Sequence, residues 1–202
     1  MSQAMTENIQ TVQSSQTVDY TDQKRVVNSI AMIMILVSLS MLFATLFLGY
    51  TVYRVSADTW PPFGFETISL TIPGISTLLV LLSSFFLVLF KSSWLQEKKS
   101  SKYFYFTALA FGFGFLLSQF QLWASLKASG ILAGSSVFAS MVYAFTWIHA
   151  AHMVVGILAL LWISTSLKGF SEEQLTKMIN VEKFWHFLGV IWVIIFFGIF
   201  VF

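Results

Sequence analysis

Residues 184–202 read FWHFLGVIWVIIFFGIFVF and contain no lysine, arginine, aspartate or glutamate. A helix needs about 20 predominantly apolar residues to cross a bilayer, and this stretch has that length. Four more apolar runs precede it, at Val26–Tyr53, Ile68–Phe90, Tyr103–Leu126 and Ser136–Leu167. The sequence therefore predicts an all-α polytopic membrane protein, a bundle of five transmembrane helices.

The composition supports the same class. Of the 202 residues, 57% are hydrophobic and 10% are charged, whereas soluble domains carry roughly 25% charged residues. The sequence does not show the short alternating segments of a membrane β-barrel. It has no cysteine, which excludes disulfides and thiolate metal sites.

The first 25 residues differ from the rest of the chain. They are rich in serine, threonine and glutamine, and they lack the apolar core of a cleavable signal peptide. Such a composition favours a disordered segment. We therefore expect a polar, disordered cytoplasmic tail over residues 1–25 and a five-helix membrane domain over residues 26–202.

Basic residues are distributed unevenly between the predicted loops. All 11 lysines and arginines except Arg54 and Lys127 lie on one side of the predicted spans. Because cytoplasmic loops carry the excess of basic residues, this pattern places the N-terminus in the cytoplasm and the C-terminus outside.

Ionisable side chains are rare in the predicted spans. All nine acidic residues lie in the tail or in loops, which argues against an autonomous pump or small transporter, since these use ionisable relays in the membrane. The ionisable side chains within the predicted spans are those of His149, His152 and His186. Either these are metal or heme ligands, or they are hydrogen-bonded packing residues. The second interpretation is favoured because His186 lies several turns from the depth of the other two. For Gln119 we expect a hydrogen bond towards the bundle.

Four motifs follow one another along the chain. The first is Trp60-Pro61-Pro62 with Pro73-Gly74-Ile75-Ser76-Thr77 and Ser83-Ser84, and the second is Gln119-Phe120-Gln121-Leu122-Trp123. The third runs from Thr146 through His149 and His152 to Gly156, and the fourth is Phe184-Trp185-His186-Phe187 continuing to Trp192. In this order they resemble the motifs of subunit III of heme-copper terminal oxidases, the cytochrome c oxidase subunit III family, in its five-helix bacterial form.

The resemblance implies a non-redox subunit of an aerobic respiratory terminal oxidase, with an aa3-type cytochrome c oxidase as the first expectation. Such a subunit stabilises the catalytic subunit, binds structural phospholipid and shapes oxygen and proton access while the complex reduces O2 to water and pumps protons. Alternatives are subunit III of a quinol oxidase, an accessory subunit of a nitric oxide reductase and, in a different class, a small transporter.

The resemblance also implies where cofactors and partners lie. Heme and copper are expected in oxidase subunits I and II, and no cofactor, metal or catalytic residue is expected in this chain. The other expected partners are phospholipids and a larger respiratory supercomplex, with no nucleic acid. The expected location is the bacterial cytoplasmic (inner) membrane.

Motif residues are candidates for structural or lipid-contact roles. These candidates are Trp60, Pro61, Pro62, Pro73, Thr77, Gln119, Trp123, His149, His152, Gly156, Trp185, His186 and Trp192.

The sequence also departs from the family pattern at three positions. Leu39, Leu122 and Gly189 stand where acidic residues are usual in the family.

Overall fold

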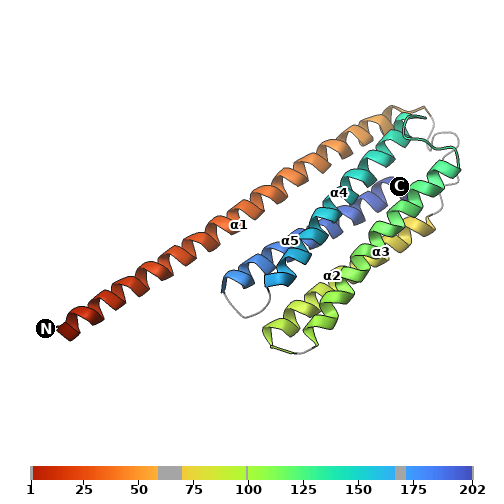
Figure 1. Cartoon of the computed structure of the whole chain (residues 1–202). Helices are drawn as coiled ribbons and strands as arrows, with labels where there is room; N and C mark the ends of the chain where they lie inside the picture. Colours follow the sequence, from red (N-terminus) through yellow and green to blue (C-terminus); the bar gives the residue numbers. More distant parts are fainter. Residues whose placement is uncertain (1, 59–69, 99, 167–171, 202) are drawn as a thin grey trace.

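The computed structural model consists of helices and short connections over the residues that it describes, 2–58, 70–98, 100–166 and 172–201 (Figure 1). Side chains are described from residue 23 onward, except at 165, 166 and 172. Five helices are long and apolar enough to cross a membrane, which confirms the predicted fold class; the sidedness of the termini stays a prediction. The elements are α1 (Ser2–Ser56), α2 (Thr71–Leu95), α3 (Ser101–Ala128), α4 (Val137–Ser166), α5 (Glu172–Ile195) and a short π-helix, η1 (Phe196–Val201).

The first helix, α1, is longer than a membrane is thick. It has 55 residues, so at about 1.5 Å per residue it is roughly 80 Å long, against about 40–45 Å for a bilayer with its headgroups. Its N-terminal part projects beyond the other helices in Figure 1. Residues 2–25, for which the composition predicts disorder, belong to this helix. No proline or glycine precedes Gly49, so the sequence contains no strong helix stop there. The domain boundary at residue 25 stays a prediction.

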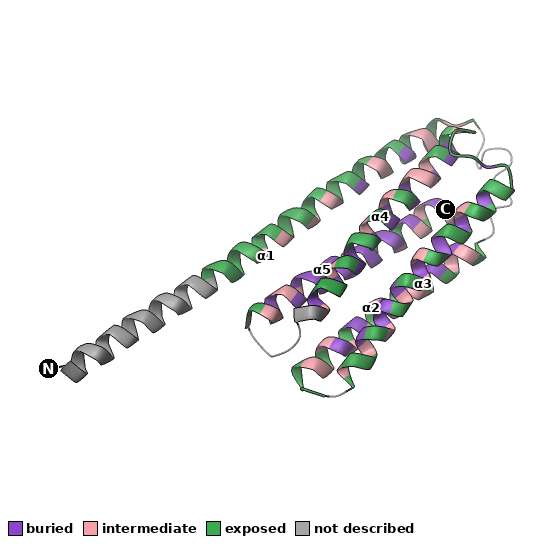
Figure 2. Cartoon of the chain, viewed as in Figure 1, coloured by how far each residue is buried: buried purple, intermediate pink, exposed green. Residues whose placement is uncertain are grey.

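The last long helix, α5, lies at the centre of the bundle. It contacts α1, α2 and α4, while α2 and α3 form the most extensive helix pair. In the most apolar stretch of α1, 6% of the residues are buried, against 44% in the most apolar stretch of the span formed by α5 and η1. Figure 2 shows this difference as exposed residues along α1 and buried residues along α5. The core therefore forms around α5, with α1 at the periphery.

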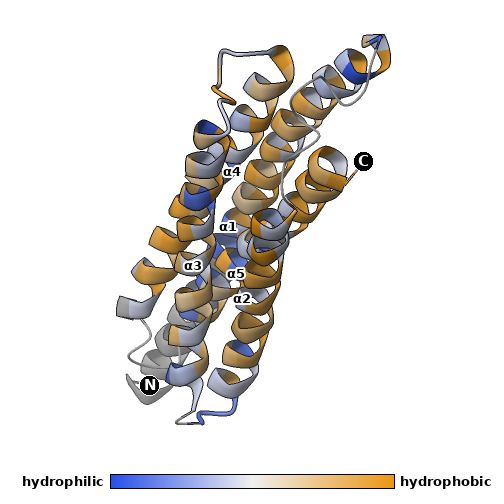
Figure 3. Cartoon of the chain, turned by 90° about the vertical axis from the view of Figure 1, so that its right-hand side faces the viewer, coloured by the Kyte–Doolittle hydropathy of each residue, from blue (hydrophilic) through white to orange (hydrophobic). Residues whose placement is uncertain are grey.

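Large apolar side chains cover the outside of the bundle. Met34, Phe106 and Leu117 are 68%, 66% and 65% exposed. Exposure to water costs roughly 25 cal/mol per Å² of apolar surface, a penalty that hydrocarbon does not impose. Figure 3 shows hydrophobic colour over most of the helices and hydrophilic colour at the turn between α2 and α3. This surface is suited to lipid contact.

Proline and glycine mark the helix ends. Pro73 is the third residue of α2, within the predicted first turn, where the missing N–H costs no intrahelical hydrogen bond. After α3, Gly130 has a φ of 79°, a conformation that glycine adopts without strain. It allows the Ile131 N–H to donate to the Leu126 carbonyl at 2.9 Å, which closes the helix end.

Candidate functional site

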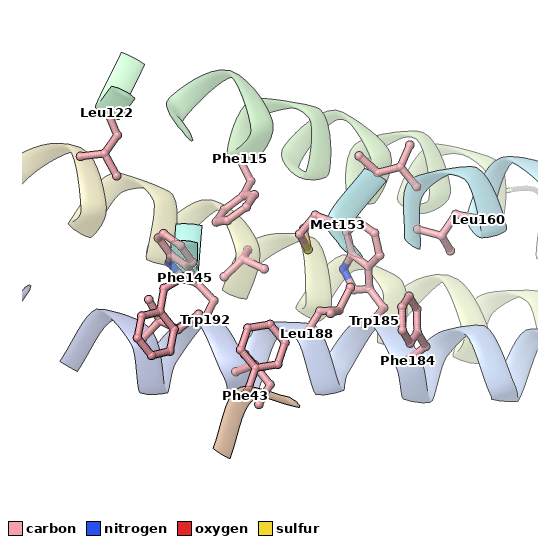
Figure 4. Packing of buried hydrophobic residues seen from close by; sticks show 14 of the residues in the cluster. Phe43, Phe115, Leu122, Phe145, Met153, Leu160, Phe184, Trp185, Leu188 and Trp192 are labelled. Carbon is pink, nitrogen blue, oxygen red and sulfur yellow. The ribbon is translucent and has the colours of Figure 1, made fainter. Parts of the chain in front are cut away.

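Trp185 of α5 is the side chain at which the third and fourth motifs meet. It is fully buried, and Figure 4 shows its indole beside Met153 in the core. A Cβ placed on Gly112 of α3 would lie 2.9 Å from Trp185 Cη2, and one on Gly156 of α4 would lie 3.1 Å from Cε3. Both distances are shorter than an ordinary carbon contact. The glycines therefore let three helices close around one indole ring.

Trp192 makes a second junction two turns further along α5. Its Nε1–H donates to the Thr77 hydroxyl of α2 at 3.1 Å, and that hydroxyl donates to the Pro73 carbonyl at 2.9 Å. Because Trp192 is fully buried, this bond satisfies the only polar atom of its side chain. Candidate residues from the first and fourth motifs thus form one contact between α2 and α5.

His149 of α4 is enclosed by aromatic rings. It is fully buried, and its ring centroid lies 5.2 Å from that of Trp192, 5.6 Å from Phe115 and 6.2 Å from Phe43. Neither ring nitrogen has a hydrogen-bond partner among the described residues. The hydrogen bond predicted for His149 is not found among the described residues. Aromatic contacts surround the imidazole instead, and the sequence alone did not reveal these neighbours.

His152, one turn later, does form a hydrogen bond. Its Nδ1 lies 2.7 Å from the Ile148 carbonyl, so this nitrogen carries the proton, since a carbonyl can only accept. The His152 ring also lies 5.9 Å from Phe43 of α1. Across the described ranges, no three histidine, aspartate or glutamate side chains come together as metal ligands would.

Polar side chains connect α2 and α3 inside the bundle. Gln119 is fully buried, as is Ser76, and Gln119 Nε2 donates to Ser76 Oγ at 3.1 Å. The Ser76 and Ser118 hydroxyls lie 2.7 Å apart. The hydrogen bond expected for Gln119 is present. Ser118 was missed because a serine in an apolar run gives no indication of which helix it faces.

Trp123 belongs to an apolar groove between α3 and α4. Its Nε1–H donates to Thr146 Oγ1 at 3.0 Å, and its ring centroid lies 5.5 Å from that of Trp147. The groove has a volume of about 350 Å³, and Trp123, Trp147 and Ala150 are among the residues that line it. The remaining candidates of the first motif, Trp60, Pro61 and Pro62, lie outside the described residues.

Comparisons with known proteins agree with this arrangement of motifs. The model of the cytochrome c oxidase subunit III family matches residues 3–202. The chain belongs to this family. It is 31% identical to cytochrome c oxidase subunit 3 of Thermostichus vulcanus over 174 residues, 83% of each chain. It is 30% identical to that of Synechocystis sp. over 169 residues, 81% of this chain and 71% of the relative. Cytochrome bo(3) ubiquinol oxidase subunit 3 of Pseudomonas putida is 28% identical over 158 residues, 77% of this chain and 76% of the relative.

One acidic side chain of this subunit III chain is buried within a helix, where none was expected. The helix α5 begins at Glu172 rather than near Phe184, so Glu182 is inside a helix and its side chain is only 10% exposed. Glu182 Oε2 lies 2.7 Å from Lys91 Nζ of α2, and Oε1 lies 3.7 Å from His186 Nε2. The prediction that all acids lie in the tail or in loops is wrong for Glu172, Glu173 and Glu182, which all belong to α5. The i, i+4 spacing of Glu182 and His186 is the sequence signal from which their contact could have been predicted.

The three positions at which the subunit III motifs lack acids lie in or against the core. Leu122 is 1% exposed, and Leu39 packs against the buried cluster. A Cβ on Gly189 would lie 3.3 Å from Ser84 Oγ of α2. Apolar or small side chains therefore occupy these positions, and an acidic function there is not available to this chain.

Proposed function

We propose that the chain is the non-redox subunit III of an aerobic respiratory terminal oxidase of the aa3 type. In this role it stabilises the heme-copper subunit I and its partner subunit II, and it holds phospholipid at the surface of the complex. Family membership supports an association with other oxidase subunits, and two of the relatives reported above carry the name cytochrome c oxidase subunit 3.

The packing of side chains between α3, α4 and α5 is the observation that supports a structural role for this chain. Trp185 fills the space left by Gly112 and Gly156, and His149 is enclosed by rings. Such packing holds helices in fixed positions. Because these side chains are buried, they cannot contact a substrate. The electron transfer and oxygen reduction are therefore assigned to the partner subunits, where heme and copper are expected.

A second candidate is subunit III of a quinol oxidase. The similarity to the ubiquinol oxidase subunit of Pseudomonas putida favours it, because the same fold serves a complex with a different electron donor. In both cases we place the chain in a bacterial inner membrane, with the N-terminus in the cytoplasm. We also propose that the complex joins a larger respiratory supercomplex.

The test is purification of the complex through an affinity tag on this chain, in mild detergent. We expect two larger oxidase subunits to co-purify, with a heme absorption spectrum and with copper. Oxygen consumption with reduced cytochrome c, and with a ubiquinol in a parallel assay, separates the two candidates. A tagged membrane protein of another family is the control. Recovery of the chain without heme-containing partners would contradict both candidates.

A further inference from the structure

The N-terminal part of α1 extends beyond the rest of the bundle. Residues 2–22 are helical, and at about 1.5 Å per residue they are roughly 30 Å long. We call them the projecting segment, and Figure 1 shows them past the ends of the other helices. The segment contains no proline or glycine, the residues at which helices usually kink. It therefore continues the direction of the membrane span and stands away from the bilayer surface.

The composition of the projecting segment does not favour an isolated helix in water. Residues 2–22 include four threonines and three serines, which form helices less readily than alanine because of their lost side-chain freedom and competing hydrogen bonds. Most helical stability in proteins comes from the packing of an amphipathic face. The helix in the structure and a composition typical of disorder agree if a partner surface holds the segment.

The helical period places the larger apolar residues of the projecting segment on one face. Met5, Ile9, Val12 and Tyr20 occupy positions of this face, and Gln16 lies between the last two. At about 100° per residue, these five positions fall within about 80° of the helix circumference. We call them the apolar stripe. So narrow a stripe on a polar helix is typical of packing against one other helix.

The charge of the projecting segment favours a protein partner over a membrane surface. The segment carries Glu7, Asp19 and Asp22 and no lysine or arginine. Helices that bind membrane surfaces are rich in basic residues, because the cytoplasmic leaflet is negatively charged. All three acids lie outside the apolar stripe. A protein surface with an apolar strip flanked by basic residues therefore complements both the stripe and the charge.

We propose that the apolar stripe of the projecting segment docks onto a helix of another subunit of the same complex, on the side of the membrane that the N-terminus occupies. That helix exposes apolar side chains flanked by lysine or arginine. Docking supplies the packing that the segment lacks within its own chain. The inference rests on the proposed function for the presence of partner subunits, and it goes beyond that function by assigning them a contact outside the membrane.

The test is the rate at which a maleimide reacts with one introduced cysteine, since the chain has no cysteine of its own. Gln16→Cys places the thiol in the apolar stripe, and Ser14→Cys places it about 160° away around the helix. In the purified complex, Gln16→Cys should react about tenfold more slowly than in the full chain purified alone, in the same detergent. Ser14→Cys should change less than about twofold.

The comparison of the two preparations also separates the alternatives. Equally fast reaction of Gln16→Cys in both would overturn the proposal in favour of a solvated segment. Equally slow reaction in both would overturn it in favour of a contact within this chain or with a second copy. Slow reaction of the chain alone in phosphatidylglycerol vesicles would overturn it in favour of a membrane surface.

Ile9→Asp is the disruptive variant, and Val18→Asp is its matched control. Both replace a β-branched apolar residue with aspartate, and the two positions lie about 180° apart around the helix. Added to Gln16→Cys in the complex, Ile9→Asp should restore fast reaction, whereas Val18→Asp should leave it slow. Equal effects of the two variants would overturn the proposal in favour of a general effect of charge or of helix loss.

The two proposals fail separately. The presence or absence of heme-containing subunits in the preparation decides the proposed function before any labelling. If those subunits are absent, the same cysteine variants are labelled in native membranes. The difference between Ile9→Asp and Val18→Asp then still decides whether the projecting segment docks onto a protein partner.

Discussion

Trp185 Cη2 lies 2.9 Å from the position that a Cβ of Gly112 would occupy. The indole of α5 thus reaches the backbone of α3 without any side chain between them. We expect Gly112→Ala to destabilise the chain by about 1–3 kcal/mol, because the added methyl group forces the buried ring to move. Thermal unfolding in detergent measures the change. Gly114→Ala is the control, since its Cβ would meet Leu79 at an ordinary 3.6 Å; equal effects would contradict the assignment.

The hydrogen bond between Trp192 and Thr77 should contribute to stability as a pair. Thr77→Val leaves the buried Trp192 Nε1–H without its acceptor, at a cost of about 1–3 kcal/mol. In a double-mutant cycle, Trp192→Phe combined with Thr77→Val should cost less than the sum of the single changes. Thr107→Val is the control, because the Thr107 hydroxyl donates to the Tyr103 carbonyl of its own helix and thus does not join two helices. Additive single effects would show that the two residues do not interact.

His149 should act through its shape rather than through its nitrogens. His149→Phe keeps a ring among the surrounding rings, so we expect a change in stability below about 1.5 kcal/mol. His149→Ala leaves a cavity and should cost about 2–5 kcal/mol, as other large-to-small core changes do. Iron and copper in the purified complex, measured by elemental analysis, should be unchanged in both variants. Loss of a stoichiometric metal would instead identify His149 as a ligand.

Glu182 should hold α2 and α5 together at one end of the bundle. Glu182→Gln removes the ion pair with Lys91, and because Lys91 is 32% exposed, solvent reduces the expected loss to about 1 kcal/mol. The matched control is Glu173→Gln, whose carboxylate is 71% exposed in its pair with Lys177. That change should shift the unfolding temperature very little. If both variants unfold alike, the contact between α2 and α5 does not depend on Glu182.

The topology can be tested with reporters fused to the C-terminus. The distribution of basic residues predicts that this end lies outside the cytoplasm. Green fluorescent protein fused there should therefore remain dark after Sec-dependent export, and alkaline phosphatase should be active. The reverse result would show that the orientation is wrong. An N-terminal fluorescent fusion, which should fluoresce, controls for expression.

Apolar runs predicted the five helices because each membrane span must satisfy its own backbone hydrogen bonds. They did not predict where α5 begins. Charged residues such as Glu173, Lys177 and Glu182 resemble a loop, yet a helix can continue beyond the hydrocarbon layer. The motifs indicated Trp185 and Trp192, but not the partners of these rings. Those partners lie on other helices, and helix order in space cannot be obtained from the periodicity of one chain.

The central position of α5 has a consequence for biogenesis. Ribosomes deliver α1 to α4 to the membrane before α5, yet α1, α2 and α4 all pack against α5. Until Trp185 arrives, the space beside Gly112 and Gly156 has no occupant from this chain. The extensive pair of α2 and α3 can form before α5 is made, whereas the contacts of α1, α2 and α4 with α5 can form only afterwards. We therefore expect the bundle to close only after α5 has been translated.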